Sequence, residues 1–131
     1  MSALAQHASQ STVDPAREGY VALKVFFNIT EQWQCTPEEQ RILLGGVSRA
    51  TLFRYKRLPQ MELSRDILDR ISAVMGIYGG AQILLGSLQR AIKWIRTPST
   101  DFNQESAMDR MLRGSLMDIV EIRRYIDGLR G

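Results

Sequence analysis

Helix-start signals recur along this chain, and they constrain its fold more than any other feature. Polar residues that can cap a helix stand directly before stretches of apolar periodicity at Asp14, Thr36, Ser48, Ser64 and Ser115. The side-chain oxygen of such a residue accepts a hydrogen bond from one of the free backbone N–H groups at a helix start. After each cap, apolar residues recur at helical intervals rather than in strict alternation. We therefore predict an all-α fold.

Residues 36–46, "TPEEQRILLGG", carry the most complete of these signals. Thr36 and Glu39 have the spacing of a capping box, and Pro37 occupies the first helical position. Gly45 and Gly46 end this helix, because glycine adopts a left-handed backbone at little cost. A second helix follows Ser48 and ends before Pro59. Two short helices joined by a glycine turn are typical of a helix-turn-helix motif.

The second helix of this pair has an apolar inner face and a basic outer face. Leu52 and Tyr55 lie one turn apart and can pack on the first helix together with Val47. The side chains left facing outwards are Arg49, Ala50, Phe53, Arg54, Lys56 and Arg57. Segment 36–58 holds five basic and two acidic side chains, in a chain whose formal net charge is +3. A local basic face of this kind suits contact with phosphates.

In a helix-turn-helix, the start of the second helix meets base edges. We expect Arg49 and Arg54 to bind guanines, because arginine forms bidentate hydrogen bonds with this base. Ala50 can touch a thymine methyl group. The residues expected to bind phosphates are Ser48, Thr51, Lys56 and Arg57. The alternative is a solvated amphipathic helix whose arginines only keep it soluble.

One such motif reads about half of an operator, so we expect a homodimer on a two-fold-related site. Ser64 opens a helix that can continue to Leu85 despite Gly76, Gly79 and Gly80. These glycines predict close approach by another helix. The helical pattern restarts after Gly86 and ends at Thr97-Pro98, "STDFNQ" is expected to be a loop, and two further helices follow. The apolar segment 77–95 is the expected dimer contact.

Several classes of protein and site are not expected here. Cys35 is the single cysteine, so no intramolecular disulfide can form, and His7 is the single histidine. There is no catalytic constellation, metal-ligand spacing or phosphate-binding glycine loop, so we expect no enzyme activity, cofactor or metal. We expect no signal peptide, and no apolar run approaches the roughly 18 residues that span a bilayer. We expect a cytoplasmic protein without membrane contact.

Residues 91–129, "AIKWIRTPSTDFNQESAMDRMLRGSLMDIVEIRRYIDGL", resemble the C-terminal toxin-binding domain of Xre/MbcA/ParS-like antitoxins. The positions that fit the family pattern are Trp94, Pro98, Phe102, Met108, Leu112, Gly114, Val120 and Ile126. Upstream, "WQCTPEEQRILLGGVSRATLFRYKR" resembles the N-terminal helix-turn-helix of the same antitoxins, and the helix after Ser64 resembles their linking helix. Structural roles are expected for Trp94, Pro98, Phe102, Leu112 and Gly114. The sequence departs from the family at Ser99, Asn103, Gln104 and Ala107, so we expect a loop of different shape.

This resemblance implies an antitoxin of a type II toxin–antitoxin pair. Such a protein neutralises a RES-domain toxin, which degrades NAD⁺, by covering its active site, and it represses its own operon by binding operator DNA. Toxin contacts are expected from Arg123, Arg124 and Arg130, with Tyr125 and Asp127 beside them. The domain organisation that follows is a disordered start (1–14), a helix-turn-helix domain (15–62), and a linking helix with the toxin-binding domain (63–131). The alternative is a plain helix-turn-helix regulator whose second half dimerises or senses a ligand.

Overall fold

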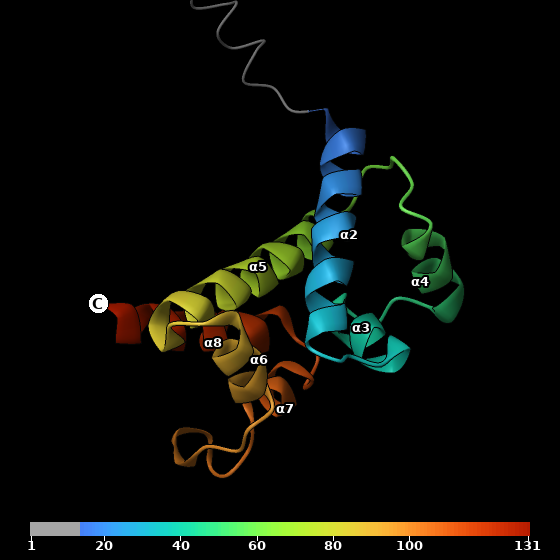
Figure 1. Cartoon of the computed structure of the whole chain (residues 1–131). Coiled ribbons are helices and arrows are strands. Elements are labelled where there is room, and N and C mark those ends of the chain that lie inside the picture. Colours follow the sequence, from blue (N-terminus) through green and yellow to red (C-terminus); the bar gives the residue numbers. More distant parts are fainter. Residues whose placement is uncertain (1–13) are drawn as a thin grey trace, which may run out of the picture.

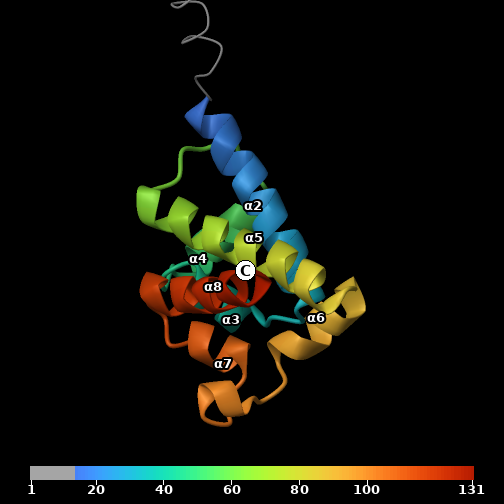
Figure 2. The ribbon, with the colours of Figure 1, turned by 90° about the vertical axis from the view of Figure 1, so that its left-hand side faces the viewer.

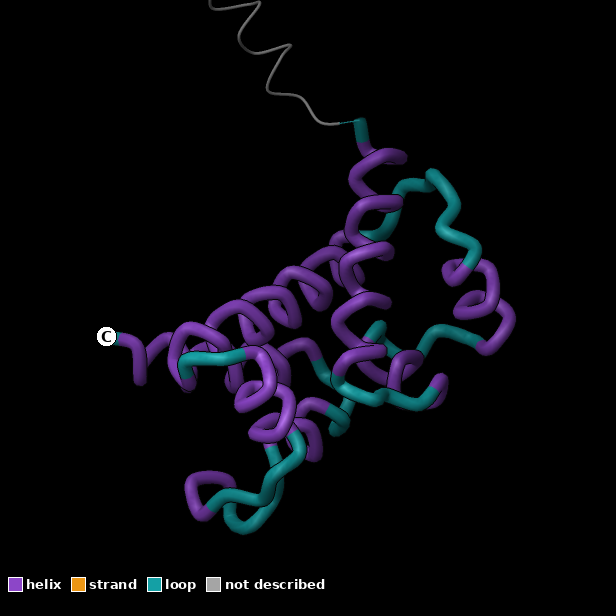
Figure 3. Tube along the Cα trace, in the orientation of Figure 1, coloured by secondary structure: helices purple, strands orange, loops and turns teal. Residues whose placement is uncertain are grey.

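A computed structural model describes residues 14–131, which form seven α-helices and one short 3₁₀ helix (Figure 1). In chain order the elements are α2 (Pro15–Gln32), α3 (Pro37–Leu43), α4 (Arg49–Lys56), α5 (Arg65–Leu85), α6 (Leu88–Ile95), η1 (Thr100–Phe102), α7 (Ala107–Met111) and α8 (Leu116–Arg130). Figure 3 shows helices and loops but no strand over this part of the chain. The all-α prediction is confirmed. The expected disordered start lies outside the described residues except for Asp14.

The predicted helix caps are confirmed. The side chains of Asp14, Thr36, Ser48, Ser64 and Ser115 each accept a hydrogen bond from a backbone N–H of the helix that follows. Thr36 and Glu39 form both bonds of the capping box, and a third-position aspartate completes the same box at α7 and α8. The starts of these helices therefore follow from short-range hydrogen bonds that the local sequence specifies.

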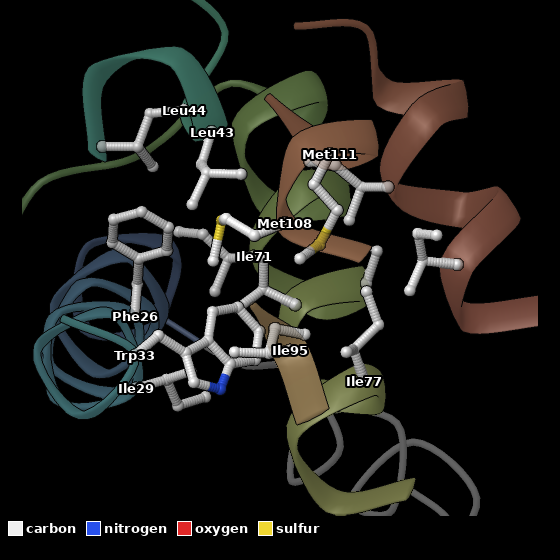
Figure 4. Packing of buried hydrophobic residues seen from close by; sticks show 14 of the residues in the cluster. Phe26, Ile29, Trp33, Leu43, Leu44, Ile71, Ile77, Ile95, Met108 and Met111 are labelled. Carbon is white, nitrogen blue, oxygen red and sulfur yellow. The ribbon is translucent and has the colours of Figure 1, made fainter. Parts of the chain in front are cut away.

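Helices from both halves of the sequence pack into one hydrophobic core. Figure 4 shows its buried side chains, which come from α2, the end of α3, α5, α6 and α7: Phe26, Ile29, Trp33, Leu43, Leu44, Ile71, Ile77, Ile95, Met108 and Met111. The last helix adds Ile119, Ile122 and Ile126 to the same cluster. Segments 15–62 and 63–131 therefore share their interior.

The long helix α5 lies directly alongside α8 (Figures 1 and 2). At Gly76 the space of a missing side chain is filled by the guanidinium of Arg123, which donates from Nη1 to the Ser72 carbonyl over 3.2 Å. One turn later, Ile126 packs on Gly80. The contacts advance along both helices in the same direction, so α5 and α8 are parallel. The predicted close approach of a helix to the glycines of α5 is confirmed at these two positions.

The segment predicted as the loop "STDFNQ" contains the 3₁₀ helix η1, and a single β-bridge between Ser99 and Glu105 closes its base. Asn103 and Gln104 stand where the family often has glycine, and both adopt left-handed backbone angles, with φ of 54° and 72°. Asparagine tolerates this conformation better than most residues. The left-handed backbone that glycine favours is therefore present here without glycine.

Adjacent glycines in α5 provide a matched test of this packing. A Cβ atom at Gly80 would lie 2.8 Å from Cγ2 of the buried Ile126, whereas a Cβ atom at Gly79 would meet nothing within 4 Å. We predict that Gly79→Ala raises the free energy of unfolding by about 0.5–1 kcal/mol, because alanine has the higher helix propensity. Gly80→Ala should lower the free energy of unfolding by about 1 kcal/mol, because the cost of overpacking, about 1–3 kcal/mol, exceeds the gain in helix propensity. Urea denaturation of both variants measures the difference, and stabilisation of both would contradict the packing.

Candidate functional sites

Helix α4 is held against α3 by its apolar face and by the turn that joins them. Leu52 and Tyr55 are only 4% and 5% exposed, which confirms the predicted inner face. Gly45 and Gly46 both have positive φ, of 98° and 83°, as the glycine turn requires. Arg41 of α3 reaches across the turn and donates from Nε to the Val47 carbonyl over 2.7 Å. The orientation of α4 is therefore fixed by packing and by a side-chain bond.

The outer face of α4 presents its cations to solvent. The residues predicted to face outwards are all exposed: Arg49, Ala50, Phe53, Arg54, Lys56 and Arg57. None of the four cations forms a salt bridge with an acidic residue of segment 14–131. The hydroxyls of Ser48 and Thr51 hydrogen-bond each other over 3.0 Å at the helix cap. The face can thus offer four uncompensated positive charges to a polyanion.

Phe53 lies on this face, and the sequence did not lead us to assign it a binding role. Its side chain is 63% exposed, on the same ridge of the helix as Arg49 and Arg57, at spacings of four residues. The Arg57 guanidinium lies 4.8 Å from the centroid of its ring. The signal that could have identified it is an aromatic residue at an outward position of a basic helix.

The residues predicted to contact a toxin lie on α8 and divide into two groups. Arg124, Asp127 and Arg130 are exposed. Arg123 is half-buried, because it covers Gly76 of α5, and its Nε lies 3.9 Å from Asp127 Oδ2. Arg123 and Asp127 therefore also bind within the chain, and the Arg130 side chain passes close to Gly80 of α5. The exposed acidic residue Glu121 lies on the same helix as the exposed Arg124 and Arg130.

Tyr125 belongs to an aromatic group at the edge of the same helix. Its ring is parallel to that of Trp94, with centroids 6.4 Å apart, and meets Phe102 edge-on at 4.9 Å. Its hydroxyl donates to Asp101 over 2.5 Å, and this hydrogen bond raises the pKa of Tyr125. Phe102 is buried while Trp94 is half-exposed, so the group ties η1 and α6 to α8 and leaves part of two rings accessible.

The remaining residues with an expected structural role lie in the turns around α6 and α7. Pro98 is exposed directly after α6, and Leu112 is half-buried at the end of α7. Gly114 has φ of 102°, and its carbonyl accepts a 3.0 Å hydrogen bond from Nη1 of the buried Arg70. Arg70 also lies under Gly45 in the turn between α3 and α4. One side chain therefore touches the turn before α4 and the turn before α8.

Arg96, at the end of α6, forms a second link between the halves. Its Nε donates to the Trp33 carbonyl over 2.9 Å, and its two Nη atoms bind the Glu39 carboxylate at 2.8 and 3.3 Å. The hydrogen bonding of Arg96 to the Glu39 carboxylate lowers the pKa of Glu39. Cys35 lies beside the pair, and burial raises the pKa of its thiol to about 11, so the thiol is protonated at neutral pH. A bidentate ion pair thus joins the start of α3 to the end of α6.

The two groups of candidate residues lie at opposite ends of the molecule. In Figure 1, α4 is at the right and the C-terminal end of α8 at the left. Figure 2, viewed from that left-hand side, places the end of α8 in front and α4 behind it. Two large partners could therefore bind one chain at the same time.

Residues 14–131 hold no group of three or more His, Cys, Asp or Glu side chains placed to bind a metal ion. No single helix among them is long and apolar enough to cross a membrane. Helices α5 and α6 meet those criteria only when taken together, with a bend of 119° between them.

Comparison with known proteins places both ends of the molecule in described families. Residues 13–76 match the antitoxin Xre-like helix-turn-helix domain, and residues 80–131 match the antitoxin Xre/MbcA/ParS C-terminal toxin-binding domain. The chain is also similar to the "Uncharacterized protein y4oB" of Sinorhizobium fredii (strain NBRC 101917 / NGR234). The two are 37% identical over 109 residues, which cover 83% of this chain and 84% of the relative.

The Arg96–Glu39 pair predicts a specific dependence of stability on pH. Because the folded state lowers the pKa of Glu39 below its ordinary value of 4.5, the pair stabilises the fold above that pH. This contribution is lost as the pH falls through the lowered value. Glu39→Gln keeps an amide oxygen for the capping box but removes the charge. We predict that the variant is less stable than the wild type at pH 7 and loses less stability between pH 5 and pH 3, as measured by urea denaturation.

The variant Arg96→Gln removes the other partner of the ion pair. Its free energy of unfolding should likewise fall less than that of the wild type between pH 5 and pH 3. If Glu39→Gln and the wild type lose stability in parallel below pH 5, the pair does not stabilise the fold.

Proposed function

Because this chain belongs to the Xre-like antitoxins that carry an Xre/MbcA/ParS toxin-binding domain, we propose that it neutralises a RES-domain toxin and represses its own operon. The observation that carries the proposal is that the two family matches coincide with two separate exposed surfaces, the basic face of α4 and the face of α8 that carries Arg124 and Arg130. In this proposal the protein acts by binding, in the cytoplasm, as the antitoxin of a type II pair. The toxin it opposes degrades NAD⁺.

The DNA-binding part of the proposal rests on α4. Arg49 and Arg54 face outwards on its first and second turns, where the helix of such a motif meets base edges. Lys56 and Arg57 lie at its end and suit phosphates, which set register but carry no sequence information. Ser48 and Thr51 can still approach phosphates, although their hydroxyls already hydrogen-bond each other. Ala50 is exposed beside Arg49 and free to touch a base methyl.

The toxin-binding part rests on α8 and its surroundings. Arg124 and Arg130 are exposed and can bind acidic groups of a nucleotide cleft, where arginine forms strong charge-assisted hydrogen bonds. The partly exposed rings of Tyr125 and Trp94 add the aromatic surface common at binding hot spots. In this proposal Arg123 holds α8 on α5, Asp127 pairs with Arg123 along α8, and both contact the toxin only with their exposed atoms.

In this proposal residues 15–62 bind DNA and residues 63–131 bind the toxin. Helix α5 packs against helices of both parts. Two copies bind one operator, because one motif covers half of a two-fold site. The proposed dimer contact is segment 77–95, where Ile83 is 66% exposed and Leu88 is 37% exposed.

For DNA binding we predict different effects of two substitutions on α4. Arg49→Ala should weaken operator binding by about 1–3 kcal/mol and hardly change binding to random DNA. Lys56→Ala should weaken both about equally. Gel-shift titrations with the promoter fragment of the operon and with a shuffled duplex measure both effects. A titration with the operator duplex at a concentration far above the dissociation constant should saturate at two protein chains per duplex. Unchanged operator affinity in both Arg49→Ala and Arg54→Ala would show that α4 is not the recognition helix.

For neutralisation we predict that Arg124→Glu combined with Arg130→Glu weakens toxin inhibition by more than the roughly 0.5 kcal/mol expected for a solvated surface change. The measurement is NAD⁺ consumption by the toxin titrated with each full-length variant. Point variants are needed, because deleting α8 would also remove the core residues Ile119, Ile122 and Ile126.

Arg17→Glu serves as the control, since it reverses an exposed charge at the start of α2, and Figure 1 shows that this end of α2 lies away from α8. It should inhibit the toxin as the wild type does. If the α8 double variant inhibits equally well, α8 does not provide the charged contacts. If the wild type binds its operator but never affects the toxin, the alternative of a plain regulator is favoured.

A further inference from the structure

Phe53 is an unusual side chain for the surface on which it lies. It is the large apolar side chain of an otherwise polar face, and 63% of it is exposed. On its α3 side the ring borders an open groove of about 420 Å³, whose other walls include Pro37 and Arg41. On its other side lies Arg57, 4.8 Å from the ring centroid. Neither neighbour buries the ring, so the fold gains little apolar burial from a phenylalanine here.

The position of Phe53 on α4 aligns it with the residues proposed to bind DNA. Arg49, Phe53 and Arg57 are four residues apart, and such residues lie above one another on one side of a helix. Ala50 and Arg54 form the adjacent ridge. When α4 lies in a major groove with these ridges inwards, Phe53 sits between two arginines and faces the base edges rather than the phosphates.

The major groove offers one apolar group that a phenyl ring can recognise. Guanine, adenine and cytosine present hydrogen-bond donors and acceptors there, whereas thymine adds its C5-methyl group. We propose that Phe53 is a specificity-determining residue that contacts thymine methyl groups of the operator. This inference rests on the proposed repressor function and adds that the operator contains thymines which Phe53 recognises. Such a thymine should lie between the bases that Arg49 and Arg54 contact and the phosphate that Arg57 contacts.

Replacing thymine by deoxyuridine tests the proposal, because only the methyl group is removed from the base. The probe is the promoter duplex of the operon, synthesised once with thymine and once with deoxyuridine throughout the protected region. Full-length wild type should bind the deoxyuridine duplex roughly fourfold more weakly for each methyl contacted. Phe53→Ala should bind the thymine duplex more weakly than the wild type does. Its ratio of affinities for the two duplexes should move towards one.

Two matched variants separate the possible roles of the ring. Phe53→Leu retains an apolar side chain and should keep part of the preference for thymine. Arg57→Ala should weaken binding to both duplexes equally, and the same behaviour in Phe53→Ala would show that the ring only positions Arg57. Circular dichroism checks that each exposed substitution leaves the helices intact.

The outcomes distinguish this inference from the function on which it rests. Specific binding of the promoter with equal thymine preference in wild type and Phe53→Ala would overturn the role of Phe53 and leave repression standing. Wild-type binding no tighter to the promoter than to a shuffled duplex would overturn repression, and the Phe53 proposal with it. A Phe53→Ala variant that binds DNA normally but no longer binds the toxin would show that the ring docks a protein instead.

Discussion

The close approach of α5 and α8 at Gly76 and Gly80 is the contact on which the rest of the structure depends. A side chain at Gly80 would push against Ile126, which is fully buried and stiff because it is β-branched. The short distance lets α8 complete the core that α2 and α5 begin. Every other helix of the C-terminal half lies on the path of the chain between these two parallel helices, so their separation sets where α6, η1 and α7 can pack.

Two arginines then join the segments that the sequence presents as separate functional parts. Arg70 contacts the turn before α4 and the turn before α8, and Arg96 connects the end of α6 to the start of α3. Arg70 binds the Gly114 carbonyl and the Asp66 carboxylate, and Arg96 binds the Trp33 carbonyl and the Glu39 carboxylate. These bonds to the backbone fix the position of the chain as well as balancing charge. The orientation of α4 is thereby linked to the packing of the C-terminal half, although α4 and the end of α8 lie at opposite ends of the molecule.

The sequence predicted the parts of the structure that depend on short-range interactions. Caps such as Thr36 and Ser64 bind a backbone N–H three residues away, so their sequence context is sufficient. The inner face of α4 followed from the spacing of Leu52 and Tyr55. The contacts of Arg70 with Gly114 and of Arg96 with Glu39 could not be predicted, because these partners lie 44 and 57 residues away. For the same reason Arg123 was expected to face a partner, whereas much of it packs on α5.

The shared core also bears on how long each activity of the protein persists in a cell. Since residues from α2 and from α8 are buried in one cluster, neither end can unfold alone without exposing the interior of the other. A protease that acts on the unfolded chain would therefore remove the proposed DNA-binding and toxin-binding surfaces together. Conversely, a partner bound at either end lowers the population of unfolded chains by mass action and lengthens the lifetime of both sites. Proteolysis rates measured with and without toxin or operator DNA would reveal this common lifetime.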